Sequence, residues 1–334
     1  MTTGLATRMM AASDEAIALA ARLLADGGLV AFPTETVYGL GADATNGAAV
    51  ARLYAAKGRP SFNPLIAHVP DITAARQLAC FDDDTERLAK AFWPGPLTLV
   101  LPKALGCPVA ELATAGLDTI AVRVPAHSVA RSLIAAFGKP IVAPSANRSG
   151  HVSPTTAQHV LTDLAGRIDL VLDGGAASVG VESTIVACLD GPAMLLRPGG
   201  LPRADIERVL GHPLAEPMPA PTKQDNDDDG LLAPGMLASH YAPRARLRLD
   251  AADVRTGEAL LAFGPSPPFG TERAAVVRNL SARGDLVEAA ANLFSYLRAL
   301  DAAGADIIAV MPVPHEGLGE AINDRLARAA APRP

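Results

Sequence analysis

The sequence has few features of a secreted, metal-binding or membrane protein. Its 334 residues include only three cysteines, an odd number without any CxxC pair, so neither a disulfide framework nor a structural zinc site is expected. Met1–Ser13 contains one arginine and no sustained apolar run, and the later apolar stretches are interrupted by charges or prolines. A transmembrane helix needs about 20 consecutive apolar residues. We therefore expect a cytoplasmic protein without membrane association.

A strong charge of one sign and the common nucleotide and hydrolase motifs are also lacking. Lys and Arg number 29 against 35 Asp and Glu, a formal net charge of -6, so any nucleic-acid contact would need a local basic patch. No GxxxxGK[ST], GxSxG or HExxH is present. These absences disfavour a P-loop ATPase and the commonest hydrolases.

What is present indicates two globular domains of α/β type. Hydrophobic residues make up 49% and charged residues 19%, and the length exceeds what one compact core usually serves. In the first 210 residues short apolar runs alternate with helical patterns, which predicts a mixed α/β domain whose strand order stays open. Strands are expected at 29–32, 65–69, 97–101, 119–124, 140–143, 170–172, 183–187 and 194–197, and helices at 14–26, 48–56, 84–92, 128–137, 156–164 and 203–210.

The composition changes after residue 211. Prolines and the acidic run Asp225–Asp229 predict a flexible linker, which divides the chain into a domain at 10–211, a linker at 212–243 and a domain at 244–334. The last part carries strand patterns at 246–249, 259–263 and 306–310 and helical patterns at 286–303 and 318–330. This order predicts a small doubly wound unit, and it contains no glycine-rich phosphate motif.

Two loops of the first domain are rich in chemical groups. Lys57–Pro64 holds two cations, a hydroxyl and an amide, and its prolines and glycine prevent a helix. Lys and Arg suit phosphate and carboxylate oxygens, although a solvated basic turn is the alternative. Pro33–Leu40 places two hydroxyls, a carboxylate and a phenol between a strand and an expected glycine turn. It either lines a pocket or caps the turn.

Further polar groups follow other expected strands. Arg123 lies in an otherwise apolar strand, which is costly unless the guanidinium meets an anion, either a ligand or an internal Asp or Glu. Pro144–Gly150, Val181–Thr184 and Leu196–Gly199 each place polar groups at a strand end. Together with Lys57–Asn63, these segments predict a converging, phosphate-handling anion pocket.

These segments resemble, in order and spacing, the Sua5/YrdC/YciO family. The resemblance spans roughly residues 14–210 and is carried by Pro33–Ala44, Lys57–Val69, Trp93–Leu101, Thr119–Pro125, Pro144–Asn147, Val181–Val186 and Leu195–Gly200. Ala233–Met236 and Ser239–Pro243 resemble the linker of the Sua5 branch, with Leu237-Ala238 standing where basic and aromatic residues are common. The implied fold is a YrdC-like twisted mixed sheet with a basic concave face, plus a smaller C-terminal Rossmann-like Sua5 domain.

The resemblance implies a nucleotidyltransferase, L-threonylcarbamoyladenylate synthase. Such an enzyme converts L-threonine, bicarbonate or CO2, and ATP to threonylcarbamoyl-AMP and pyrophosphate for the t6A modification of tRNA. Mg²⁺ would be held through the ATP phosphates with no metal ligand from the protein. Downstream t6A transferase proteins are implied partners, and a contact with tRNA or double-stranded RNA is left open. The alternative is a non-catalytic protein that binds double-stranded RNA or tRNA.

The family's site residues carry over onto matching positions. The threonine site corresponds to Thr34, His68, Arg123, Ala143 and Ser183. The ATP site corresponds to Arg59, Asn63, Thr119, Ser145, Ser153, Arg197 and Tyr241, and the catalytic tetrad to Lys57, Arg59, Ser145 and Asn147. A carbamoyl adenylate hydrolyses readily, so a closing segment is useful, and the linker around Tyr241 is the candidate lid.

Overall fold

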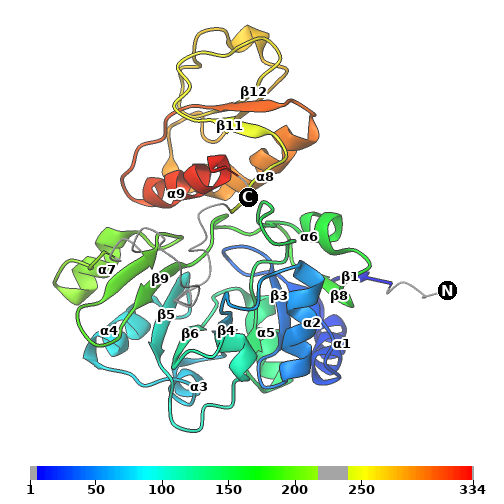
Figure 1. Ribbon diagram of the computed structural model, residues 1–334, viewed down its shortest axis with the longest axis vertical. Coiled ribbons are helices and arrows are strands. Elements are labelled where there is room, and N and C mark those ends of the chain that lie inside the picture. Colours follow the sequence, from blue (N-terminus) through cyan, green and yellow to red (C-terminus); the bar gives the residue numbers. More distant parts are fainter. Residues whose placement is uncertain (1–5, 217–239, 333–334) are drawn as a thin grey trace, which may run out of the picture.

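The computed structural model describes residues 6–216 and 240–332, which form a large and a small α/β unit (Figure 1). The large unit is a ten-stranded mixed sheet in the order β1-β8-β2-β3-β7-β4-β6-β5-β9-β10. Its strands are β1 (Arg8–Ala11), β2 (Val30–Phe32), β3 (Gly39–Asp43), β4 (Ile66–His68), β5 (Leu97–Pro102), β6 (Thr119–Arg123), β7 (Ile141–Val142), β8 (Leu170–Asp173), β9 (Thr184–Ala187) and β10 (Met194–Arg197). Its helices are α1 (Asp14–Ala25), α2 (Gly47–Lys57), α3 (Ile72–Arg76), α4 (Asp83–Phe92), α5 (Ser128–Phe137), α6 (Ala157–Leu164) and α7 (Arg203–Leu210), with a 3-10 turn at Glu111–Thr114.

Local capping sets where α2 begins and ends, and this places one site residue. The Asn46 side chain accepts hydrogen bonds from the first backbone amides of the helix, as a good N-cap does. Gly58 ends the helix in the left-handed conformation (φ 59°), which a glycine adopts without a steric penalty. Lys57 is therefore the last helical residue, and the chain turns directly into the Arg59 loop.

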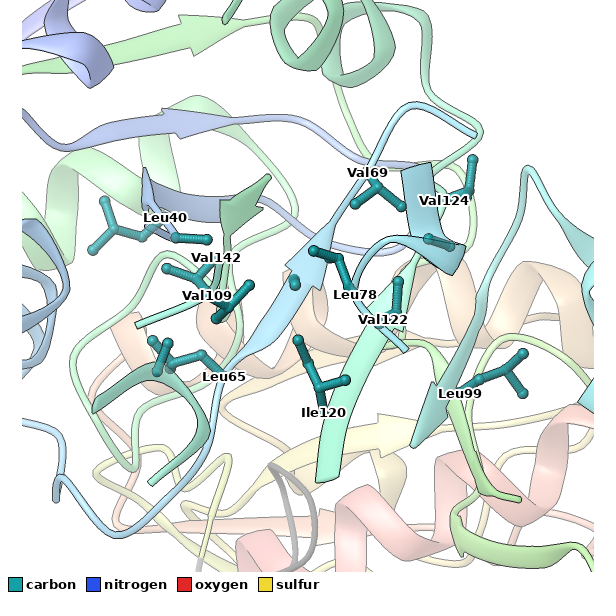
Figure 2. Close-up of a cluster of buried hydrophobic side chains, with 14 of the residues drawn as sticks. Leu40, Leu65, Val69, Leu78, Leu99, Val109, Ile120, Val122, Val124 and Val142 are labelled. Carbon is teal, nitrogen blue, oxygen red and sulfur yellow. The ribbon is translucent and has the colours of Figure 1, made fainter. Parts of the chain in front are cut away.

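Helices cover both faces of the large sheet. Helices α1 and α5 pack on one face of β2, β7 and β8, and α2, α4, α6 and α7 pack on the other face of the sheet. Figure 2 shows part of this second core, where Leu40, Val142, Val122 and Leu99 from four strands lie among other buried side chains. Side chains alternate along a strand. Ile120 and Val122 therefore join this core, while Ala121 and Arg123 face the opposite side.

The expected strands and helices are confirmed, with no end shifted by more than one residue, but four elements were missed. These are β1, α3, β3 and, in the small unit, β13 (Val276–Asn279). The glycine turn expected at Gly39 is wrong, because β3 begins there and pairs antiparallel with β2 and β7. A Cβ on Gly41 would lie 2.8 Å from the Phe32 ring. The glycines thus allow close neighbours in a central strand rather than a turn.

The small unit has a parallel sheet in the order β11-β14-β12-β13, formed with β11 (Arg246–Arg248), β12 (Ala259–Ala262) and β14 (Ile307–Val310). Both helices, α8 (Leu286–Ala302) and α9 (Leu318–Ala330), pack on one face, against Leu261, Ile308 and Val310. The other face is covered by non-helical segments that contribute Ala251 and Val254. The expected parallel sheet is confirmed, whereas helices on both faces, as in a doubly wound unit, are not found in the described residues.

Helices α8 and α9 lie between the small sheet and the large unit (Figure 1). The hydrophobic cluster under them includes Val37, Val152 and Val181 of the large unit, so one core spans the interface. Most of the expected linker, at 217–239, is outside the described residues, and the domain boundaries stay a prediction. Within the described residues, no helix is long and apolar enough to cross a membrane.

Candidate functional site

A cavity of about 50 Å³ lies where the two units meet. The residues around it come from strands β4 and β6, the loops after β2 and β7, the segment before β9, the end of β10 and residues 240–241. Of the site residues expected from the sequence, the cavity is lined by Arg59, His68, Arg123, Ala143, Ser145, Ser183, Arg197 and Tyr241. The remaining ones do not line it: Thr34, Lys57, Asn63, Thr119, Asn147 and Ser153. The cavity is also lined by residues that the site prediction did not name, although all of them lie within the quoted segments: Thr36, Val37, Ile66, Pro144, Glu182 and His240.

Arg123 has an internal carboxylate partner. Its Nη2 donates to Glu35 Oε1 at 2.6 Å, and its Nη1 donates to Thr36 Oγ1 at 2.9 Å. Burial by itself raises the pKa of Glu35, but the Arg123 guanidinium outweighs this and leaves the pKa below its ordinary value. The alternative of an internal acidic partner is thus confirmed, while Arg123 also borders the cavity.

Thr34 lies behind this pair. The Thr34 hydroxyl donates to the Val37 carbonyl at 2.6 Å and lies 2.8 Å from Thr36 Oγ1. It therefore shapes the turn that presents Thr36, instead of lining the cavity. A signal for Thr36 was present in the sequence, because it shares a motif with Thr34.

His68 is neutral and of one tautomer. Burial lowers its pKa to about 3. Its Nδ1 lies 3.1 Å from the Ile66 carbonyl, which can only accept, so Nδ1 carries the proton and Nε2 is an acceptor.

Lys57 bonds to the loop that follows β7. Its Nζ donates to the carbonyl oxygens of Ser145 and Asn147, both at 2.5 Å. Burial lowers its pKa well below the ordinary value. The side-chain amide of Asn147 donates to two carbonyls, while its Oδ1 is buried with no hydrogen-bond partner among the described residues. Lys57 therefore holds the backbone that presents Ser145.

Arg59 and Asn63 brace each other within one loop. Arg59 Nη2 donates to Asn63 Oδ1 at 2.5 Å and to the Pro64 carbonyl at 3.0 Å. Burial lowers the pKa of Arg59 to about 10. Thr119 lies at the amino end of β6, four residues before Arg123 on the same face of the strand.

Arg197 and Glu182 form the other wall. Arg197 Nη2 donates to Ser183 O at 2.9 Å and to Ser183 Oγ at 3.2 Å. Glu182 accepts a short hydrogen bond from the Ser153 hydroxyl. Its Oε2 also forms an ion pair with Nε of Arg325 of α9, at 2.8 Å. Burial by itself would raise the pKa of Glu182. The positive charges of Arg325 and Arg197 outweigh this effect, so the net result is a pKa below the ordinary value.

His240 and Tyr241 close the cavity. Tyr241 is 1% exposed and has a left-handed backbone (φ 63°). His240 is 7% exposed, and its Nδ1 has no hydrogen-bond partner among the described residues. His240 also borders a groove of about 980 Å³ that includes Gly58, Ser149 and α8 residues. It therefore separates the small cavity from this groove.

Three arginines, Arg59, Arg123 and Arg197, line one cavity together with Thr36, Ser145, Ser183 and the imidazole of His68. Such a set suits carboxylate and phosphate groups. In residues 6–216 and 240–332, no group of three or more His, Cys, Asp or Glu side chains could hold a metal ion. The fold and the site thus define an α/β protein with an arginine-lined pocket that is suited to anions and is bordered by residues 240–241.

Comparison with known proteins specifies this class further. A family model for Sua5/YciO/YrdC proteins, described as "Telomere recombination", matches residues 22–199, and a model described as "Threonylcarbamoyl-AMP synthase, C-terminal domain" matches residues 201–331. The chain belongs to the Sua5/YrdC/YciO family.

Similar proteins extend over nearly the whole chain. It is 43% identical to the threonylcarbamoyl-AMP synthase of Pyrococcus abyssi, with 95% of this chain and 94% of that protein covered. It is 41% identical to the Bacillus subtilis protein of the same name, covering 98% and 96%. The solved structure of P. abyssi Sua5 complexed with L-threonine matches with a TM-score of 0.84 at 41% identity, covering 98% of this chain and 97% of that one.

Proposed function

We propose that this chain is a threonylcarbamoyl-AMP synthase, which forms threonylcarbamoyl-AMP and pyrophosphate from L-threonine, bicarbonate or CO2, and ATP, for t6A synthesis. The observation that carries the proposal is the convergence of Arg59, Arg123 and Arg197 on one cavity. Relatives named for this activity, and a threonine-bound relative of the same fold, support it.

Arg123 and His68 suit the amino acid. The Arg123 guanidinium would bind the threonine carboxylate while it keeps Glu35 as its internal partner. The His68 Nε2 acceptor would take a hydrogen bond from the threonine hydroxyl or amine. Ser183, fixed by Thr98 at 2.7 Å and by Arg197, is a further polar contact for this substrate.

Arg59, Ser145 and Arg197 suit the nucleotide. The threonine nitrogen adds to CO2 and loses a proton, and a carbamate oxygen then attacks the α-phosphorus of ATP. The bond between that phosphorus and the oxygen bridging to the β-phosphate breaks, and pyrophosphate leaves. Positioning and charge stabilisation by fixed guanidinium groups and hydroxyls would supply most of the rate acceleration. Lys57 would act by holding the Ser145 backbone.

The donor set fits a Mg²⁺ ion that is held mainly by phosphate oxygens. The described residues contain no acidic cluster, but the buried Asn147 Oδ1 lacks a hydrogen-bond partner there and is an oxygen of the type that Mg²⁺ accepts. When bound, the ion would neutralise charge on the phosphates.

Residues His240 and Tyr241 would act as a lid. A water molecule needs about 10–15 Å³ of such volume, so a cavity of about 50 Å³ has room for a few waters and cannot hold both substrates with this pair in place. Displacing His240 would join the cavity to the large groove and admit them. Deleting residues 230–334 should then lower activity or the yield of intact product, and full activity of the truncated chain would refute the lid.

The test of the reaction is pyrophosphate release from ATP and bicarbonate with each amino acid in turn. We expect stimulation by threonine well above serine, and no such difference would overturn the proposal. Arg197→Met should lower the rate by about 100-fold or more, while Arg208→Met, an exposed arginine of α7, should leave it unchanged. Contact with tRNA, double-stranded RNA or transferase proteins stays a prediction, which salt-dependent tRNA binding would test.

A further inference from the structure

Arg325 of α9 is a fully buried arginine that reaches the site from the C-terminal domain. Its side chain is 0% exposed, its Nε donates to Glu182 Oε2 at 2.8 Å, and its Nη1 donates to Asp324 Oδ2 at 2.5 Å. Its guanidinium carbon lies 5.1 Å from the centre of the Tyr241 ring. Glu182 and Tyr241 line the cavity, whereas Arg325 does not. Arg325 therefore contacts the lining of the cavity at these two residues.

The stability of the fold does not explain this arginine. Replacing a buried ion pair by apolar side chains of similar volume is often neutral or stabilising. Arg325 Nη2 is also a buried donor with no hydrogen-bond partner among the described residues, and such a donor costs free energy. The guanidinium is better explained by the geometry that it imposes on its neighbours.

Tyr241 needs such a support. An aromatic residue at φ 63° is strained, and the conformation persists only where surrounding contacts hold it. The Tyr241 ring contacts Arg325 on α9 and stacks on Phe294 of α8, with ring centres 5.6 Å apart. The two helices of the C-terminal domain thus hold the lid tyrosine.

Glu182 carries the same influence to a second segment. Its Oε2 accepts from Arg325 and its Oε1 accepts from the Ser153 hydroxyl. The Ser153 segment is also held by α8, because Arg298 donates to the carbonyl of Val152. A change at Arg325 would consequently move both Tyr241 and Ser153, which are both predicted residues of the ATP site.

We propose that Arg325 is a positioning residue, which holds the Tyr241 ring and the Glu182 carboxylate so that the C-terminal domain sets nucleotide affinity and retention of the product. This inference rests on the proposed function. A positively charged planar group is required, since it must pair with a carboxylate and lie against an aromatic ring at once.

The experiment uses the full chain and four variants, the last of which, Arg325→Lys, is described below. Arg325→Met removes both contacts, and Glu182→Gln/Arg325→Met also removes the unpaired buried carboxylate, so that folding is preserved. The matched control is Glu320→Gln, which breaks another ion pair across the same interface, to Arg203 at 2.6 Å, without touching the cavity. Thermal midpoint, KM for ATP, kcat, the ratio of intact threonylcarbamoyl-AMP to AMP, and amide exchange are measured for each.

We expect both Arg325 variants to raise KM for ATP by about tenfold, with a much smaller change in kcat, and to lower the proportion of intact product. Exchange of the Ala242 amide, which donates to Gly150 O at 2.9 Å, should be faster in both and unchanged in the control. If the double variant regains both the wild-type thermal midpoint and the wild-type KM, Arg325 is only structural and the proposal is wrong.

Amide exchange separates this inference from the proposed function, because it needs no turnover. Absence of threonine-dependent pyrophosphate in the wild type would refute the function alone. Unchanged exchange in Arg325→Met would refute the positioning role alone. Arg325→Lys keeps a charge for Glu182 but not a planar face for Tyr241, so the Ala242 amide should exchange as fast in this variant as in Arg325→Met. Exchange at the wild-type rate in Arg325→Lys would contradict the role assigned to the ring contact.

Discussion

Replacing Arg123 by methionine should destabilise the large domain in a way that depends on pH. The side chains of Arg123 and Glu35 are 5% and 10% exposed and lie 2.6 Å apart. The substitution leaves the Glu35 carboxylate buried without its countercharge. Removing one partner of a buried ion pair typically costs about 3–5 kcal/mol, and we expect a loss of this size at pH 7.

A second substitution should recover part of this loss. In Glu35→Gln/Arg123→Met no charge is left uncompensated. In the wild type the Ala126 backbone N–H donates to Glu35 Oε2 at 3.1 Å, and the side-chain amide oxygen of the new glutamine can still accept this hydrogen bond. We expect the double variant to be about 2 kcal/mol more stable than Arg123→Met.

The pH dependence follows from the two environments of Glu35. In the wild type its pKa lies below the ordinary 4.5, so its contribution is complete above that value and is lost only as the pH falls through the lowered pKa. Without Arg123, only the backbone N–H groups oppose the effect of burial, so the pKa of Glu35 rises and the folded variant takes up a proton at a higher pH than the wild type does. The destabilisation should therefore shrink by about 1 kcal/mol or more at pH 5.

Urea unfolding at both pH values measures these differences. The single tryptophan, Trp93, lies in the large domain, with Nε1 bonded to Leu97 O at 2.7 Å, so its fluorescence reports on that domain. A loss below about 1 kcal/mol that is equal at pH 7 and pH 5 would show that Glu35 does not depend on Arg123 for its charge, and would refute the reasoning.

Three other substitutions test separate parts of the structure. Gly180→Ala would place a Cβ 2.4 Å from the Ala290 carbonyl oxygen across the interface, and it should destabilise the protein by about 2 kcal/mol or more in thermal unfolding. The control is Gly211→Ala, which has the same φ of 78° but open space around it and should cost about 1 kcal/mol. His68→Gln should leave the acid limb of the kcat/KM profile unchanged between pH 5 and pH 8, because a histidine with a pKa of about 3 does not titrate there; a shifted limb would show that His68 titrates. Lys57→Met leaves two backbone carbonyls of the loop after β7 without their donor, and should lower stability by about 2 kcal/mol in urea titration as well as activity; wild-type stability would contradict the bracing role.

Much of the fold was predictable from local patterns. Helix α1 could be located from its apolar spacing, with Ser13 as N-cap, because capping and periodicity are properties of neighbouring residues. Strand β3 could not, because its glycines resemble a turn and only the close approach of the Phe32 ring explains them. Strand β13, at the edge of the small sheet, consists of two valines followed by Arg278 and Asn279, so only half of its residues are apolar and its pattern differs from that of a buried strand.

The site shows the same division. The sequence by itself determined the family, the proposed reaction and most of the charged groups around the cavity, because these residues stand in short motifs. Only the tertiary structure decided that Arg123 pairs with Glu35, that Lys57 binds backbone carbonyls, and that Arg325 of α9 reaches Glu182. Glu182 and Arg325 are 143 positions apart, and no local pattern records a contact that exists only after two domains have packed together.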